Sequence, residues 1–496
     1  MKNYTKLICL LISLMMLLPL VASCANDVVD EGGNITEGGN ADTLHPVYDQ
    51  TDLDVKTFED QLYTVMYSTV GMWGATPVKM TAYDASIDSV NKASYDRDLK
   101  FEELTGATLS YIPSDTNPND FYGSDSYSEA LRKMVSSGDI SNIDMVMLGA
   151  RTVGVLLAES FCMDLNEYDN YIHTDNSYYN VKFNNEMSLA EKQFFAMGYH
   201  TTGNIKGTEA LLVNNTALTK QHQDGGTIDE IYQLALNQEW TYEKMMTYDK
   251  GFASGDINED PTKNTYTLIM SANASQGLYY EMGGTLVEKD DQDMPLVTVN
   301  NTKNQDLLSF IKNNVTNNEK VTIVPNDGHG QVFINGQGLF MLAIVGSLGA
   351  GKLATGMDER LMPAPTYAKG EEYNSYLAAW NANVVTIPAT IGDADKAAYC
   401  FELYMALSYN YIYPEYYEKI CQLQYVENST ESQIYDLITD NIYVDYSNLY
   451  GFVGTNSIGI RPIFIDSKTE VGSLVQSVSD ELRTGIDNFL NNYDLT

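Results

Sequence analysis

Residues 126–148 read SYSEALRKMVSSGDISNIDMVML, and this stretch decides the fold class. Its first four residues have the serine-to-glutamate spacing of a capping box, which opens a helix, and Gly138 is typical of a helix stop. Residues 143–148 then form an apolar run without alternation, as expected of a strand buried on both faces. A helix followed at once by such a strand predicts α/β layering around a mainly parallel sheet.

The flanking sequence extends this pattern in both directions. Residues 62–68 are a β-prone run, and residues 89–105 predict a helix with Leu99 and Leu104 facing inward and Gly106 as its stop. Further apolar strands are predicted at 210–213, 340–345 and 384–387, and further helices at 240–246, opening at Thr241, and at 393–411, opening at Asp393 and ended by Pro414.

Six short motifs stand in order along the chain. They are SSGD at 136–139, DMV at 144–146, DLN at 164–166, LVNN at 212–215, VFINGQGLFM at 332–341 and RLMPAP at 360–365. Together they resemble the family 1 extracellular solute-binding proteins, the maltose-binding-protein-like group, over most of residues 55–425. Gln337 stands where the family usually has a lysine, and YYN at 178–180 stands in place of a paired-tryptophan pattern of some relatives.

The resemblance implies a two-lobed type II periplasmic-binding-protein fold. In this fold the chain passes between the lobes several times, forming a hinge, and the ligand binds in the cleft between the lobes. It implies that lobe 1 comprises 55–211 plus 376–411, and that lobe 2 comprises 215–372 plus 416–496. The fold further implies capture of a solute for the permease subunits of an ABC importer, without chemical change, by a protein that is expected to be a monomer.

The N-terminal segment predicts export and lipid anchoring. Residues 1–23 contain two lysines and then an apolar run that is too short for a convincing membrane anchor, as in a signal peptide. Small residues immediately precede Cys24, which resembles the acylated cysteine of bacterial lipoproteins. Residues 24–54 are rich in glycine and acidic residues and are expected to form a flexible tether. These features predict a lipid anchor at the extracytoplasmic face of the cell membrane.

Composition indicates the class of ligand. Acidic residues outnumber basic ones 67 to 29, so the protein repels phosphate backbones, and nucleic acid is not an expected partner. The 36 tyrosines favour neutral polyols, because aromatic faces pack on sugar rings and phenols supply directional hydrogen bonds.

The cysteines after Cys24 are Cys162, Cys400 and Cys421, an odd number that leaves open whether one disulfide forms among them.

Three other motifs suggest chemistry but depart from their patterns. Residues 346–352 read GSLGAGK like a phosphate-binding loop, yet Leu353 stands where a hydroxyl would hold Mg²⁺. Residues 256–260 alternate oxygen ligands like a calcium loop, but Pro261 replaces the required glycine. The five histidines form no pair at metal spacing, although His200 could line a cleft. No metal or cofactor is therefore expected, and whether 256–260 binds calcium stays open.

The prediction is a carbohydrate-binding protein that is not an enzyme, in which loops at the carboxyl ends of strands hold the sugar. Aromatic rings would stack on the sugar, and Arg151 would supply a planar set of donors. The candidate ligand-binding residues are Trp73, Tyr83, Arg151, Tyr199, Gly346, Ser347, Trp380 and Asn381. Two alternatives stay open: a surface glycan-binding lipoprotein without a transport role, and a secreted glycoside hydrolase that would use two carboxylates.

Overall fold

The structure is a computed structural model that describes residues 46–68, 89–114, 126–222, 227–255, 263–420, 429–452 and 459–493. The predicted signal peptide and several other predicted features lie outside the described residues: Cys24, Trp73, Tyr83, the calcium-like loop at 256–260 and Cys421. Within the described ranges, every helix is too short or too polar to span a bilayer.

The first sheet has four strands in the order β12-β3-β1-β2. Its strands are β1 (Leu62–Ser68), β2 (Thr108–Ser114), β3 (Met145–Gly149) and β12 (Asn383–Thr386). β1 pairs in parallel with β2 and β3, while β12 runs antiparallel to β3. The prediction of a mainly parallel sheet is therefore confirmed for this part of the chain, and a strand more than 230 residues away in sequence completes its edge.

The second sheet has five strands in the order β10-β4-β9-β5-β8. Its strands are β4 (Glu209–Asn214), β5 (Tyr266–Ser271), β8 (Val321–Val324), β9 (Gly338–Ile344) and β10 (Glu359–Met362). β5 is parallel to β8 and β9, whereas β4 is antiparallel to β9 and β10. The apolar runs predicted around residues 210 and 340 form the two central strands β4 and β9, and β4 is buried at every position.

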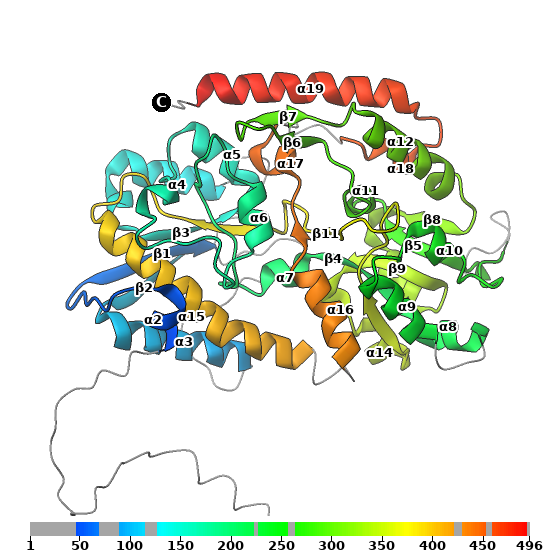
Figure 1. Ribbon diagram of the computed structural model, residues 1–496, viewed down its shortest axis with the longest axis horizontal. Coiled ribbons are helices and arrows are strands. Elements are labelled where there is room, and N and C mark those ends of the chain that lie inside the picture. Colours follow the sequence, from blue (N-terminus) through cyan, green and yellow to red (C-terminus); the bar gives the residue numbers. More distant parts are fainter. Residues whose placement is uncertain are drawn as a thin grey trace, which may run out of the picture. The chain divides into compact units, whose positions relative to one another are not determined.

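The chain passes between the two sheets repeatedly. Helix α7 (Gly203–Gly207) leads into β4, and β11 (Ser375–Tyr376) lies on the return path from β10 to β12. Helix α15 (Ala394–Ile420) packs on α3 (Ser89–Thr105), beside the first sheet, and the next helix, α16 (Ser429–Thr439), contacts β10 of the second sheet. Figure 1 shows these segments running between the two sheets. The predicted hinge crossings are thus present.

The C-terminal segment contacts elements beside both sheets. Strand β13 (Ile442–Tyr443) pairs with β11, and α17 (Tyr446–Tyr450) packs on α5 (Ala150–Ala158). Helix α19 (Val471–Asn492), red in Figure 1, contacts both α5 and α12 (Thr302–Ile311). Because these contacts reach both sides, the assignment of residues 416–496 to one lobe stays a proposal, as do the other lobe boundaries.

Several shorter elements complete the described fold. They are α2 (Pro46–Thr51), α4 (Ser126–Ser137), α6 (Val181–Glu186), α8 (Asn215–His222), α9 (Thr227–Leu236), α10 (Tyr242–Met246), α11 (Gly277–Glu281), β6 (Val287–Lys289), β7 (Pro295–Val297), α13 (His329–Ile334), α14 (Ala350–Thr355) and α18 (Pro462–Ile465). Helix α2 packs on α15 and buries Val47, so the predicted tether does not extend through residue 54 as a wholly unpacked chain. Only the segment before residue 46 stays a proposed tether.

Helix α3 (Ser89–Thr105) has the predicted bounds, but its inward face differs from the prediction. Leu99 is 49% exposed, which makes its predicted inward orientation wrong. The buried face carries Phe101 and Arg97 instead. The guanidinium of Arg97 donates to Asp98 Oδ1 at 2.7 Å and to Ser408 Oγ at 3.1 Å, and these acceptors allow a charged side chain to be buried.

Helix α15 continues through Pro414, so the predicted stop at this proline is wrong. The predicted opening is confirmed, since Asp393 Oδ1 accepts from the backbone N–H of Lys396 at 3.1 Å. A proline inside a helix removes one backbone hydrogen bond and disfavours its continuation. Here packing overrides this preference, because the tyrosine ring at 413, just before the proline, stacks on Tyr409 at 5.3 Å.

Candidate functional site

The carboxyl edges of the two sheets meet at the crossing segments. In the first sheet, β3 ends at Gly149, which pairs with Asn383, the first residue of the antiparallel strand β12. In the second sheet, β9 ends at Ile344, which pairs with Glu209, the first residue of β4. The segments before β4 and β12 therefore join the carboxyl edge of one sheet to that of the other. In open α/β sheets, ligands bind outside this edge.

Three predicted site residues come together at the edge of the first sheet. The guanidinium of Arg151 lies 5.2 Å from the ring centre of Trp380. The two segments are tied by the backbone, since Ala150 N–H donates to Ala382 O at 2.9 Å. Asn381, next to this tryptophan, is buried, and its Oδ1 has no hydrogen-bond partner. The cluster thus combines a half-buried indole, a multi-donor cation and an amide acceptor, the groups that a polyol requires.

Helix α7 connects this cluster to the second sheet. The side chain of Asn204 bonds the backbone of Asn383 twice, donating to its carbonyl at 2.9 Å and accepting from its N–H at 2.8 Å. At Gly207, a Cβ would lie only 2.9 Å from Cβ of Asn381, so only glycine allows this approach. The crossing segments at 203–207 and 377–382 are therefore packed against each other.

Gly346 and Ser347 follow β9 at the edge of the second sheet. A Cβ at Gly346 would lie 3.1 Å from the carbonyl oxygen of Lys206 in α7, so this loop touches the same crossing segment. These two residues are thus linked to Asn381 through α7. Ligand contact by any of these candidates stays a prediction.

The backbone of the glycine loop at 346–352 is already hydrogen-bonded to a side-chain carboxylate of the same chain. Glu359 is 3% exposed, and its two carboxylate oxygens accept the backbone N–H groups of Gly349 and Gly351, each at 2.6 Å. Burial raises the pKa of this carboxyl, although the two donors oppose that rise. A phosphate would have to displace this side chain, so the loop is closed to a nucleotide in this structure.

Tyr199 lies apart from the Arg151 cluster, among tyrosines of α15. Its ring centre is 5.1 Å from that of Tyr409 and 4.6 Å from that of Tyr413. Its neighbour His200 is 0% exposed, and burial lowers the pKa of its imidazole to about 3. His200 therefore does not line a cleft here, and it is neutral at physiological pH.

A polar network at the edge of the second sheet escaped the sequence analysis. Ser271 Oγ donates to Asp327, and Asn273 Nδ2 donates to the other carboxylate oxygen of Asp327 at 2.9 Å. Arg461 donates to Ala272 O at 2.8 Å and to Asn273 Oδ1 at 2.9 Å. Ser271 ends β5, while Asn273 and Asp327 follow the carboxyl ends of β5 and β8 and are exposed. Residues 325–328 read PNDG, which is a local turn signal, and Asp327 there has a φ of 56°, but nothing in the sequence links this turn to residue 461.

One buried pair of carboxyl groups lies at the same junction. Glu209 begins β4 and Glu281 ends α11, and they are 3% and 0% exposed. The alternative function as a glycoside hydrolase requires two carboxyl groups, one with a raised pKa, that a substrate can reach. This pair has a raised pKa, but in this conformation its burial keeps a substrate away.

The tyrosine pair at 178 and 179 has a structural role. Both hydroxyls donate to the carboxylate of Glu402, which is 0% exposed, and the backbone N–H of His173 donates to it at 3.1 Å. These donors satisfy a charge inside the core. The two tyrosine rings are buried, and their hydroxyls contact a carboxylate rather than solvent.

Cysteines and metal ligands form no site in the described ranges. Cys162 and Cys400 are free and buried, which excludes a disulfide between them here. Burial raises the pKa of Cys162 to about 12, so its thiol is unreactive. Among residues 46–493 as described, no group of three His, Cys, Asp or Glu side chains could hold a metal ion.

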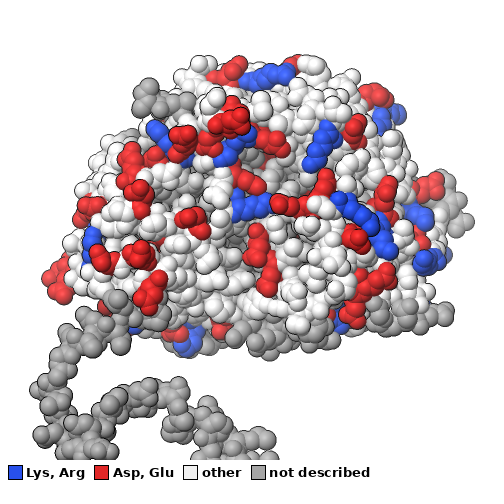
Figure 2. All heavy atoms as spheres, viewed as in Figure 1, with Lys and Arg blue, Asp and Glu red and all other residues white. Residues whose placement is uncertain are grey.

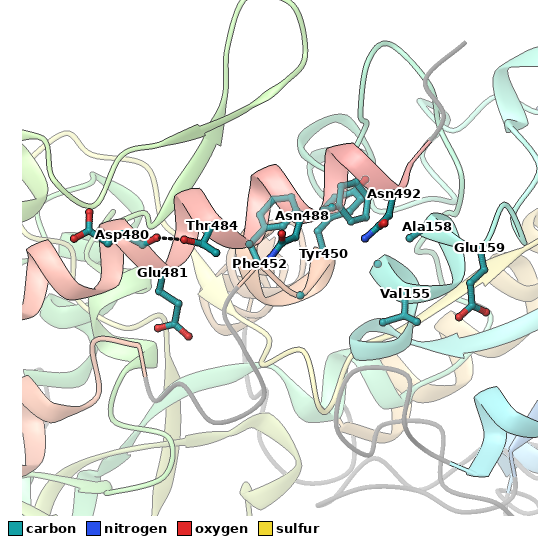
Figure 3. A pocket seen from close by; sticks show the side chains of 14 residues that line it. Val155, Ala158, Glu159, Tyr450, Phe452, Asp480, Glu481, Thr484, Asn488 and Asn492 are labelled. Atoms are coloured by element: carbon teal, nitrogen blue, oxygen red, sulfur yellow. Dashed lines mark hydrogen bonds between the residues drawn. The ribbon is translucent and has the colours of Figure 1, made fainter.

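Two cavities open outside the junction cluster. One, of about 910 Å³, lies between α5, α17 and α19, and Figure 3 shows Asn488 and Asn492 beside Tyr450 and Phe452. The two aromatic rings are 3% and 2% exposed, so they support the helices rather than offer a stacking surface. The other cavity, of about 360 Å³, is lined by lysines and glutamates near α6, β6 and residues 371–374. Figure 2 shows acidic and basic side chains intermixed over one face, with the acidic ones in the majority.

Comparisons with known proteins support the fold. No family model matches the sequence, and a comparison with curated proteins gives no match either. Among solved structures, a cyclo/maltodextrin-binding protein complexed with maltotetraose is similar, with 12% identity, coverage of 86% of this chain and 98% of that chain, and a TM-score of 0.56. UgpB from Mycobacterium tuberculosis in complex with glycerophosphocholine is similar too, with 14% identity, coverage of 86% and 98%, and a TM-score of 0.52. The chain therefore has the two-lobed fold of the type II periplasmic binding proteins.

Proposed function

We propose that this chain is an extracytoplasmic solute-binding lipoprotein, anchored through Cys24, that binds a carbohydrate between its lobes and delivers it unchanged to an ABC importer. Lobe 1 would comprise 55–211 plus 376–411, and lobe 2 would comprise 215–372 plus 416–496. The similar structures support this class of function, because one is described with maltotetraose and the other with glycerophosphocholine, a small polar solute.

The observation that carries the proposal is the chemistry at the facing sheet edges. One edge presents the indole of Trp380 beside the guanidinium of Arg151. The other presents Asn273 and Asp327, both exposed. An aromatic face together with donors and acceptors of fixed direction is what binds a neutral polyol, while a nucleotide would need an open cradle of backbone N–H groups.

Closure of a hinge is the proposed mechanism. The two edges are joined by short crossing segments, so a small rotation within 203–207 and 377–382 would change the distance between them. A sugar that contacts both edges would favour the closed form, because only that form makes both sets of contacts. The permease subunits would then recognise the closed protein.

Calorimetric titration with maltotetraose tests the proposal, with glycerophosphocholine as a second probe and a carbohydrate panel in a thermal-shift assay as a wider search. We expect a carbohydrate to bind and to raise the melting temperature, since a ligand that binds only the native state stabilises it. If no carbohydrate binds, or if an oligosaccharide is cleaved over hours, the proposal is wrong.

A second candidate, a glycan-binding lipoprotein without a hinge motion, is favoured by a set of hydrogen bonds to the β6–β7 hairpin. Ala190 N–H donates to Asp293 O, and Ser188 Oγ and Glu191 N–H donate to the Asp293 carboxylate, each at 2.9 Å. These hydrogen bonds link the hairpin to residues 188–191. X-ray scattering with and without a bound sugar separates the candidates: compaction supports hinge closure, and an unchanged radius supports the rigid protein.

A further inference from the structure

Glu209 and Glu281 lie inside the protein without a counter-ion. Glu209 Oε2 and both carboxylate oxygens of Glu281 have no hydrogen-bond partner of normal geometry. Among the described residues, no lysine or arginine forms an ion pair with either group. An isolated carboxylate in a dry interior is very costly, and two together repel each other as well.

The pair lies between the two crossing segments and α11. A Cβ at Gly277 would overlap the carboxylate of Glu209, so the backbone of α11 lies directly against it. The backbone N–H of Tyr376, in the crossing strand β11, opposes the rise in the pKa of Glu281. The pair therefore lies where the second sheet meets both segments that lead to the first.

The charged groups on the surrounding elements are bound to other groups or exposed to solvent. Strand β9, next to β4, carries no titratable side chain. On β10 and α12, Glu359 is bound to Gly349 and Gly351, Arg360 to Asp358 and Glu431, and Lys303 to Glu371, while Asp306 is exposed. Protonation is the simplest compensation for the charge, because a neutral carboxyl is much less costly to bury than a carboxylate.

We propose that Glu209 and Glu281 are both protonated at neutral pH, and that their neutrality keeps the crossing segments packed on the second sheet. Loss of a proton at alkaline pH places an uncompensated charge against residue 376 and loosens the junction. In agreement, burial raises the pKa of Glu281 to about 8, and burial and the charge of Glu281 raise the pKa of Glu209 well above its ordinary value. This protonation does not depend on the proposed function, so its test needs no ligand.

Infrared spectroscopy tests for the proton directly. In protein labelled with ¹³C-glutamate, we expect the carbonyl band of protonated carboxyls at pH 7, its weakening as the pH rises to 10, and a weaker band at pH 7 in Glu281→Gln. Glu319→Gln, at an exposed glutamate, is the control and should keep the band. If the wild-type protein lacks the band at pH 7, or if a bound sodium or calcium ion is found by elemental analysis in its place, the proposal is overturned.

Stability and hydrogen exchange test the consequence. Native Glu281 retains a proton that the unfolded chain loses near pH 4.5, so its contribution to stability falls as the pH rises from there to about 8. We expect the wild-type melting temperature to fall by several degrees between pH 6.5 and 9, with faster amide exchange in 203–208 and 375–382. Glu281→Gln should show a smaller fall than wild type and Glu319→Gln the same fall. An equal fall in Glu281→Gln and wild type contradicts the proposal.

Discussion

Two regions of the molecule bury glutamate in opposite ways. Beside the first sheet, Glu402 accepts hydrogen bonds from Tyr178, Tyr179 and a backbone N–H, so its charge is satisfied. At the junction, Glu209 and Glu281 both have buried oxygens without a hydrogen-bond partner. Both regions are buried, so burial alone does not distinguish a structural glutamate from one that responds to pH. The completeness of the hydrogen bonding distinguishes them, because a carboxyl group with all its partners is fixed, whereas one without partners responds to protons.

Removing the satisfied carboxylate should have the largest effect. Glu402→Ala leaves two buried tyrosine hydroxyls without their acceptor, and we expect a loss of about 3 kcal/mol or more in the free energy of unfolding, measured in urea. Glu402→Gln keeps one acceptor oxygen and should lose less. Equal stabilities of Glu402→Ala and Glu319→Ala would show that the tyrosine contacts do not matter.

The backbone cradle of Glu359 offers the next test. A Cβ at Gly351 would overlap Glu359 Oε1, so Gly351→Ala should displace the carboxylate and cost about 1–3 kcal/mol of stability. Gly472 is the matched control, since a Cβ there meets nothing within 4 Å. Gly472→Ala should leave the unfolding midpoint nearly unchanged. Similar midpoints for both variants would mean that the carboxylate is not tightly held.

At the junction, Trp380→Ala should weaken sugar binding rather than folding. We expect about a tenfold loss in affinity by calorimetry, about 1.4 kcal/mol, because a stacking surface is removed. Trp240→Phe is the comparison, since Trp240 is 0% exposed in the core and should change stability without changing affinity. Unchanged affinity in folded Trp380→Ala would remove this residue from the site.

The smallest effect is expected at His173, which lies beside Glu402. The Glu402 carboxylate raises the pKa of His173, so the protonated imidazole contributes stability below the ordinary pKa of 6.5 that is lost as the pH rises through the raised value. His173→Gln should therefore lower the melting temperature at pH 5.5 by a degree or two and leave it unchanged at pH 9. Because this side chain is 34% exposed, solvent screens most of the interaction. A larger loss at pH 9 would contradict the assignment.

Local signals in the sequence predicted many of the elements. The spacing before Leu131 and the stop at Gly138 gave α4, and Thr241 caps α10 by accepting from Lys244 N–H at 3.2 Å, as predicted. The same local reasoning failed at Pro414, where packing outweighed the preference of the proline. It also predicted wrongly that Leu99 faces inward. A helix pattern shows that one face is buried, but it does not show which distant residues can accept hydrogen bonds from a buried Arg97.

The candidate site was accessible to prediction only in part. Arg151 and Trp380 were found because each lies beside the end of a strand, and the structure brings them within 5.2 Å. Asn273 and Arg461 are 188 residues apart and carry no shared motif, so only the folded chain could join them. The occupant of the glycine loop, Glu359, could not be predicted, because it reaches the loop from a separate strand.

The sequence by itself determined the layering of strands and helices and the polarity of the surface, because these depend on periodicity and composition within short windows. Only the tertiary structure decided which buried carboxyl groups are satisfied. A partner can come from any distance along the chain, as with Tyr178 and Glu402, which are 224 residues apart. The free energy of a buried charge depends on the positions of those partners, and sequence spacing does not encode them.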